Sequence, residues 1–144
     1  MFRAKTYLPL NNIKKYLVFA SLLMAVGVIL GALGAHALEG KISPVQIDSY
    51  KTGVRYMVWH ALAIFITQVI PEKLLSRGAK NRISSLFILG ILFFSVSIFL
   101  LSTRAIFGLE DSLAFLGPVT PIGGLILIIA WIYLAVQVGI KSKS

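Results

Sequence analysis

The side chains that could do chemistry in this sequence gather around two histidines. His60 lies in a hydrophobic stretch, and Tyr56 and Thr67 share its helical face at spacings of four and seven residues. An ionisable side chain inside a hydrophobic helix is rare and usually faces the interior of a bundle. His36 ends the preceding hydrophobic stretch, so a chain that turns back there brings it towards the start of the second stretch. The candidate polar cluster is therefore His36, Glu39, Arg55, Tyr56 and His60.

Four kinds of site are compatible with this polar cluster. A hydrogen-bond network that joins two helices needs only these side chains, and it is the interpretation we favour. A proton-handling or small-ligand site would use the same imidazoles. A transition-metal site would have two histidines and Glu39, which is a small ligand set. Haem held by two histidines would need both rings to face one cavity. We expect no cofactor and no metal.

The familiar catalytic patterns are missing from the sequence. It holds no cysteine, which excludes disulfides, thiolate metal sites and a cysteine nucleophile. It also holds no Ser-His-Asp pattern, phosphate loop or HExxH motif, and no acidic residue lies inside a hydrophobic stretch. We therefore expect a protein that is not an enzyme.

The elements that must position these side chains follow from the composition. The chain has 144 residues, of which 58% are hydrophobic and 13% are charged, whereas a soluble domain has about 25% charged residues. Uncharged stretches predict membrane spans at about 16–38, 54–71, 83–103 and 121–140, because a spanning helix needs about 20 residues. The second stretch is short and needs Arg55 to extend towards the headgroups. A soluble bundle would need polar helix faces that these stretches lack.

Turn residues refine the ends of these elements. Ser43-Pro44 starts a helix, so residues 44–52 form a short interfacial helix that leads into the second span. Thr120 is expected to cap the last helix, with Pro121 at its first position. The predicted fold is an all-α membrane protein with one domain over residues 1–144, a four-transmembrane-helix bundle with that short interfacial helix before the second span.

Basic residues predict the orientation of the bundle. Ten Lys or Arg residues lie in the N-terminal flank, in the loop between the second and third spans, and in the C-terminal tail, whereas the other two loops hold four. Both termini should therefore be cytoplasmic in a multi-pass protein of the plasma or inner membrane. This topology explains most of the net charge of +9, so no nucleic-acid partner is expected. Some attraction to anionic lipid is expected.

The N-terminal stretch has a second interpretation. Lys14-Lys15, an apolar run and Ala35-His36-Ala37 resemble a signal peptide with its cleavage site. The run is longer than the usual apolar region of a signal peptide and contains three glycines. We therefore expect a retained span.

Small residues mark where helices approach one another. Gly27, Gly31 and Ala35 lie on one face of the first span, and Gly123 and Gly124 open the fourth. Such faces allow close helix packing. They are compatible with a homodimer interface, but we favour packing within the bundle, because four helices must first pack on one another.

Three blocks of the sequence resemble a known family. They are GALGAHAL at residues 31–38, YKTGVRYMVWHALA at residues 50–63 and LGPVTPIGG at residues 116–124. They resemble the domain-of-unknown-function 423 family of small four-helix inner-membrane proteins, which is related to transmembrane protein 256. A further block, which lies between the second and the last of these, departs, with FSVSIF at residues 94–99 where the family tends to have FSGSLY. The resemblance implies four transmembrane helices and a plasma-membrane location, and it brings no established activity.

Two functions are compatible with these observations. The first is a structural or accessory subunit that acts through contacts within the membrane. Its expected partners are the lipid bilayer and a larger membrane complex or further copies of itself in a homo-oligomer. The alternative is a small-molecule or proton-handling membrane protein that uses His36 and His60.

Overall fold

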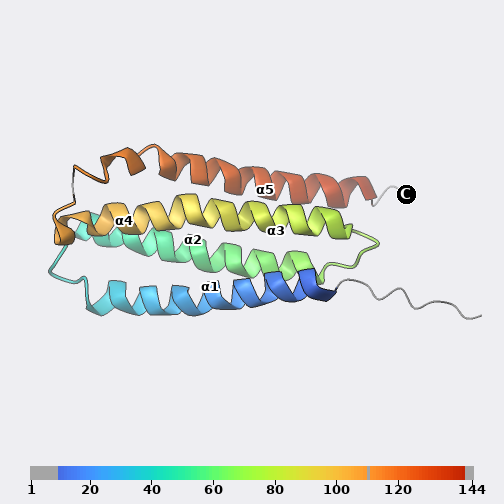
Figure 1. The fold of residues 1–144 in the computed structure, drawn as a ribbon, viewed down its shortest axis with the longest axis horizontal. Helices are drawn as coiled ribbons and strands as arrows, with labels where there is room; N and C mark the ends of the chain where they lie inside the picture. The colour runs from blue at the N-terminus through green and yellow to red at the C-terminus, as the bar shows by residue number, and fades with distance from the viewer. Residues whose placement is uncertain (1–9, 110, 142–144) are drawn as a thin grey trace, which may run out of the picture.

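The computed structural model describes residues 10–109 and 111–141, and this part of the chain is all helical. Figure 1 shows rods that lie side by side along one long axis. The long helices are α1 (Leu10–His36), α2 (Pro44–Val69), α3 (Arg77–Ile91) and α5 (Val119–Lys141). A π-helical turn, η1 (Leu92–Val96), continues α3 into α4 (Ser97–Thr103). Two short 3-10 turns, η2 (Arg104–Phe107) and η3 (Ala114–Leu116), lead to α5.

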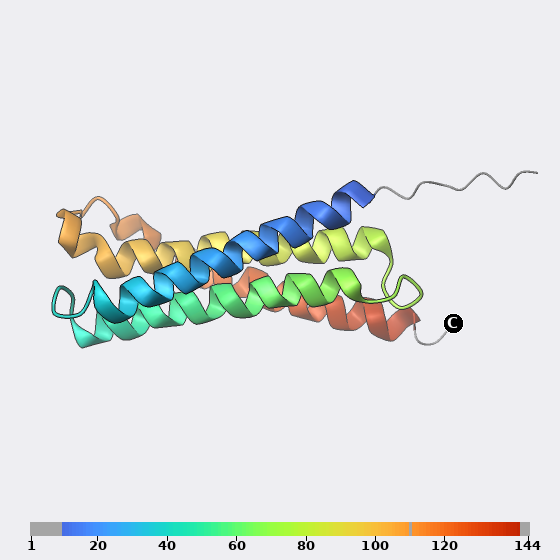
Figure 2. The ribbon, with the colours of Figure 1, turned by 90° about the horizontal axis from the view of Figure 1, so that it is seen from below.

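The rods run in alternating directions. The first turns of α1 and α3 lie at the same end of the bundle as the last turns of α2 and α5 (Figures 1 and 2). We call this the basic end, because Lys14, Lys15 and the basic residues of the α2–α3 loop and early α3 lie there. The opposite end, which holds the α1–α2 loop and the η2–η3 segment, is called the far end.

Local sequence determines where α2 begins. The Ser43 hydroxyl accepts from the Gln46 backbone N–H, and the Gln46 side chain accepts from the Ser43 backbone N–H. This reciprocal capping box, with Pro44 in the first turn, satisfies donors that a helix start leaves unpaired. The helix predicted from Pro44 is present, and it runs without a break to Val69. Residues 44–52 are thus the first turns of α2 and not a separate element.

Other helix ends differ from the sequence-based expectation by a few residues. α1 ends at His36, and the chain turns through Gly40, whose φ of 73° is the left-handed conformation that glycine adopts readily. α5 begins at Val119, so Thr120 lies inside the helix and does not cap it. The Thr120 hydroxyl instead pairs with the Ser97 hydroxyl at 2.7 Å.

α2 is the central helix, because it packs on α1, α3, α4 and η1. Three helical segments of the described chain are long and apolar enough to cross a membrane, namely Asn12–His36, Arg77–Phe107 and Ala114–Ile140. α2 is less apolar because it carries His60, Thr67 and Gln68, all of them buried. These three side chains of its second half thus face the bundle, whereas Asp48, Lys51 and Arg55 of its first half are exposed.

Glycines set the distance between α1 and α2. A Cβ added at Gly27 would lie 2.7 Å from the Val58 side chain, and one at Gly34 would lie 2.8 Å from the Tyr50 ring. Gly31 also faces α2, because a Cβ added there would lie 3.6 Å from the Val54 side chain, which is an ordinary contact distance. Ala35, expected on this face, is exposed. Gly34 lies on this face instead, because positions on one helical face are separated by alternating spacings of four and three residues.

α5 and the π-helical turn approach each other closely, backbone against backbone. A Cβ added at Gly123 would lie 2.3 Å from the Phe94 backbone nitrogen, whereas one at Gly124 would lie 3.6 Å from the Phe94 ring. The Ser97 hydroxyl lies within hydrogen-bonding distance of the Phe93 and Phe94 carbonyl oxygens and pairs with Thr120. These bonds satisfy carbonyl groups where the regular helical pattern is interrupted.

Candidate functional site

His60 lies in the interior of the bundle, with 6% of its surface exposed. Its Nδ1 atom is 2.7 Å from the Tyr56 carbonyl oxygen, one turn earlier in α2. Its Nε2 atom is 3.2 Å from the indole nitrogen of Trp131 on α5. An indole N–H can only donate, so Nε2 must accept and Nδ1 must carry the proton that is donated to Tyr56. Both ring nitrogens of a neutral His60 are therefore in use.

Aromatic rings enclose this imidazole. The ring centroids of Phe87, Tyr56 and Trp131 lie 5.6, 5.7 and 6.2 Å from that of His60. Tyr56 in turn stacks on Phe94 at 4.5 Å. The rings come from α2, α3, η1 and α5, so they join three rods around one polar ring. We call His60 and its two hydrogen-bond partners, Tyr56 and Trp131, the His60 tie.

The other members of the predicted polar cluster lie elsewhere. Arg55 is exposed, donates to the Thr52 hydroxyl at 2.9 Å and lies 4.0 Å from the Asp48 carboxylate. His36 and Glu39 are exposed near the far end. Of the five predicted residues, only Tyr56 and His60 contact each other.

The polar cluster predicts that His60 bonds to a group on the first or fourth span, with His36 or Glu39 as the expected side chain. The partner is Trp131 of α5, within the predicted fourth span, so the choice of His36 or Glu39 is wrong. The reason is depth. Gly34 packs against Tyr50 and Gly27 against Val58. His36 therefore lies level with the first turns of α2, about 17 Å from His60 along the axis at about 1.5 Å per residue. The two imidazoles do not face one cavity, as haem ligation would require.

Residues 10–109 and 111–141 contain no group of three or more His, Cys, Asp or Glu side chains that could hold a metal ion. The thin ligand set of two histidines and Glu39 is dispersed along the bundle axis. What the His60 tie can do chemically in this state is to hold α2 against α5.

A second buried polar group lies at the basic end, and sequence reasoning missed it. Lys80, counted as a loop residue, is in α3 and 4% exposed, and its Nζ donates to the Gln68 carbonyl oxygen at 3.1 Å. The Gln68 side-chain amide donates to the Ser84 hydroxyl at 2.9 Å. Lys80 thus pairs with one of the carbonyl groups that the end of α2 leaves open. The signal was the spacing of four residues between Lys80 and Ser84, which places both on one helical face.

Comparison with known proteins gives consistent matches over most of the chain. It is 36% identical over 123 residues to UPF0382 membrane protein YwdK of Bacillus subtilis (strain 168), which covers 85% of this chain and 94% of that protein. It is 33% identical to UPF0382 membrane protein SH2409 of Staphylococcus haemolyticus (strain JCSC1435), over 86% of this chain and 94% of the relative. It is 36% identical to UPF0382 membrane protein SAB0533 of Staphylococcus aureus (strain bovine RF122 / ET3-1), over 85% and 93%.

No solved structure matches the chain. The family model described as Protein of unknown function (DUF423) matches residues 30–124, which include α2, α3 and most of the His60 tie. The apolar helices and the membrane-protein relatives agree that this is an integral membrane protein. The resemblance noted in the sequence is thereby confirmed, and the chain belongs to the DUF423 family of membrane proteins, whose function is unknown.

Proposed function

We propose that this protein is a structural or accessory membrane subunit that acts through lateral contacts and has no catalytic activity of its own. The observation that carries the proposal is the His60 tie. Both nitrogens of the one buried histidine among the described residues are occupied by bonds that join α2 to α5. A histidine that relays protons or binds a ligand needs a nitrogen that is open to solvent or substrate.

The proposed topology has four spans, with both termini in the cytoplasm and the chain multi-pass in the plasma membrane. α2 is proposed as the fourth span because it has 26 residues, about 39 Å at about 1.5 Å per residue, and lies among the three more apolar segments. Residues 44–52 are proposed to lie at the interface. Asp48, Ser49 and Lys51 support this, because they are exposed at the far end, where α2 begins.

Exposed apolar faces on the outer helices support lateral contacts. α1 packs extensively on α2 alone, and its opposite face exposes Leu22, Val28 and Ile29. α5 exposes Leu125, Ile128 and Ile132. In a bilayer such faces meet lipid or another apolar helix. A larger membrane complex or a second copy of the chain is the partner that we propose for them.

Purification from native membranes tests this proposal. We expect the tagged protein, extracted in mild detergent and analysed by quantitative mass spectrometry, to retain a stoichiometric protein partner or to form a defined homo-oligomer. The His60→Leu variant should retain that partner in proportion to its folded amount. The contradicting result is wild-type protein without any partner but with a visible absorbance or a bound small molecule that His60→Leu lacks. That result would support the alternative function at His36 and His60.

A further inference from the structure

A groove opens between α1 and α3 at the basic end. It exists because α1 packs along α2 and touches α3 chiefly through the Tyr16 hydroxyl, which pairs with the Ser85 hydroxyl at 2.9 Å. Two adjoining hollows of about 440 and 490 Å³ lie on either side of this contact. Both are lined by Tyr16, Ser85 and Leu89, so they form one continuous surface around the contact. We call this surface the α1–α3 groove.

The lining of the α1–α3 groove changes from polar to apolar along the bundle axis. α1 and α3 both run from the basic end, so residue number increases in the same direction on both walls (Figure 2). Lys15 precedes Phe19 on α1, and Arg82 precedes Leu89 and Leu92 on α3. From Arg82 to Leu92 the axis advances about 15 Å. A phospholipid has the same order, with a charged headgroup followed by acyl chains.

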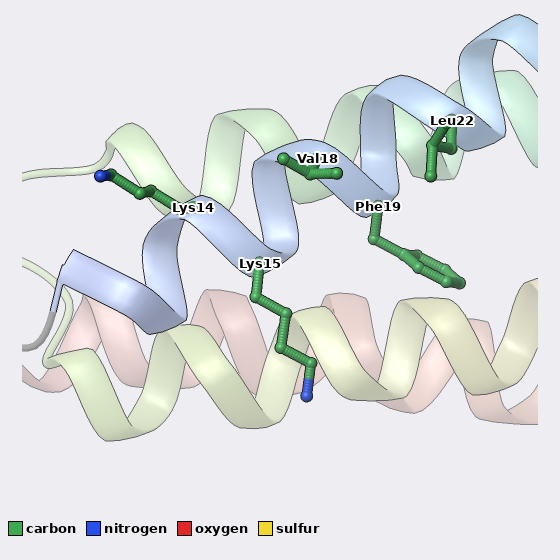
Figure 3. Close-up of a pocket in the computed structure, with 5 residues that line it drawn as sticks. All are labelled: Lys14, Lys15, Val18, Phe19 and Leu22. Atoms are coloured by element: carbon green, nitrogen blue, oxygen red, sulfur yellow. The ribbon is translucent and has the colours of Figure 1, made fainter.

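The charge of the α1–α3 groove is of one sign. Lys15 and Arg82 line it, and none of its lining residues is acidic. Figure 3 shows Lys15 and Phe19 pointing to the same side of α1, with Lys14 on the other side. Arg82 makes one long hydrogen bond, 3.5 Å to the Tyr133 hydroxyl, and its guanidinium has five N–H donors in all.

Asn81, one of the residues that line the α1–α3 groove, has a side-chain oxygen without a partner. The Asn81 Oδ1 atom is buried and accepts no hydrogen bond from the described residues. A buried acceptor without a donor is costly and is normally satisfied by water or a ligand.

We propose that the α1–α3 groove binds an anionic phospholipid. Lys15 and Arg82 donate to the phosphate oxygens, where the forked guanidinium suits a phosphate. One acyl chain lies along Phe19, Leu89 and Leu92. This site requires only the membrane location of the protein. It does not depend on the proposed orientation or on a protein partner.

Native mass spectrometry of the full-length protein in detergent tests the proposal, with phosphatidylglycerol and phosphatidylcholine of identical acyl chains as probes. We expect wild type to retain phosphatidylglycerol in preference to phosphatidylcholine. Arg82→Gln and Lys15→Gln should each lower that retention about fivefold, the usual worth of one basic side chain at an anionic surface. Lys51→Gln removes the same charge at the far end and should leave retention unchanged.

A second pair of variants keeps the charge and fills the α1–α3 groove. Leu89→Trp places a large ring in the groove and should abolish the preference for phosphatidylglycerol. Leu100→Trp is its control, because Leu89 and Leu100 are 41% and 42% exposed on the same rod, and Leu100 does not line the groove. A circular dichroism melt confirms that each variant is folded.

Three outcomes would overturn this site. One is equal retention of the two lipids by wild type. Another is displacement of phosphatidylglycerol by soluble glycerol phosphate at the same concentration, which would show that the headgroup alone is bound. The third is a dimer mass with no lipid and loss of that dimer in Leu89→Trp, which would show that a second copy occupies the groove. The first two outcomes do not bear on the proposed function. The third would support it, because a homo-oligomer is one of its expected results, so the failure of the lipid site and the failure of the proposed function remain distinguishable.

Discussion

At the scale of single residues, the position of His60 could be predicted and its partner could not. The rarity of an ionisable group in an apolar helix places His60 inside the bundle, and it is buried there. Trp131 gave no polar signal, because an indole in an apolar stretch is read as a hydrophobic side chain. Its N–H becomes important only when α5 lies beside α2. That contact joins residues 71 positions apart in the chain.

The two tryptophans allow the His60 tie to be tested with a matched control. Trp131→Phe removes the indole donor to His60 and retains an aromatic ring, so we expect a loss of about 1 kcal/mol in the free energy of unfolding, as for other hydrogen bonds between membrane helices. Trp59→Phe should cost less, because Trp59 is 57% exposed against 45% for Trp131 and makes no hydrogen bond to another helix among the described residues. Reversible unfolding in mixed micelles measures both, and equal losses would contradict the role of the Trp131 bond.

At the scale of elements, uncharged stretches and capping residues predicted the rods but not their irregularities. Ser43 and Pro44 correctly mark the start of α2, since capping is a local property. The π-helical turn has no such local signal, because the stretch around it is uncharged and mostly apolar and contains no proline. It lies where Gly123 of α5 meets the backbone of Phe94. Lys80 was misread as a loop residue because α3 begins at Arg77, six residues before the uncharged stretch.

Adjacent glycines on α5 test the close approach to η1. Gly123→Ala would place a methyl group against backbone atoms that cannot rotate away, so we expect a loss of about 1–3 kcal/mol in unfolding free energy. Gly124→Ala changes helix propensity equally but meets only an aromatic ring at ordinary contact distance. Thermal unfolding of the two variants in one detergent compares them. If Gly123→Ala were as stable as Gly124→Ala, α5 would not approach the π-helical turn as closely as the structure shows.

At the scale of the whole molecule, the composition predicted a helical membrane protein, and the helices and relatives agree. The number of spans is harder to derive, because α2 is less apolar than the other rods. Its uncharged stretch is short because the exposed Arg55 and Glu72 bound it. Within that stretch, the polar side chains that lower its hydropathy, including Thr67 and Gln68, are buried against its neighbours.

The orientation of the bundle can be tested without removing natural thiols, because the chain has no cysteine. Gly78→Cys, in the first turn of α3 at the basic end, and Lys41→Cys, in the α1–α2 loop, are both at exposed positions. An impermeant maleimide added to intact cells should label Lys41→Cys and spare Gly78→Cys until the cells are lysed. Labelling of Gly78→Cys in intact cells would contradict the proposed topology and indicate the opposite orientation.

The position of α2 at the centre of the bundle has a consequence for how the protein is made. In the proposed topology, the chain emerges from the ribosome in order, so α2 would enter the bilayer after α1 and before α3 and α5, which carry Ser84 and Trp131. Its histidine and glutamine side chains are costly to expose to hydrocarbon in that interval. Insertion of α1 and α2 together as one hairpin would reduce this cost, since the glycine face of α1 already covers one side of α2. The nascent chain would then leave the translocon as a pair of helices, and its polar side chains would acquire their last partner only when α5 is complete.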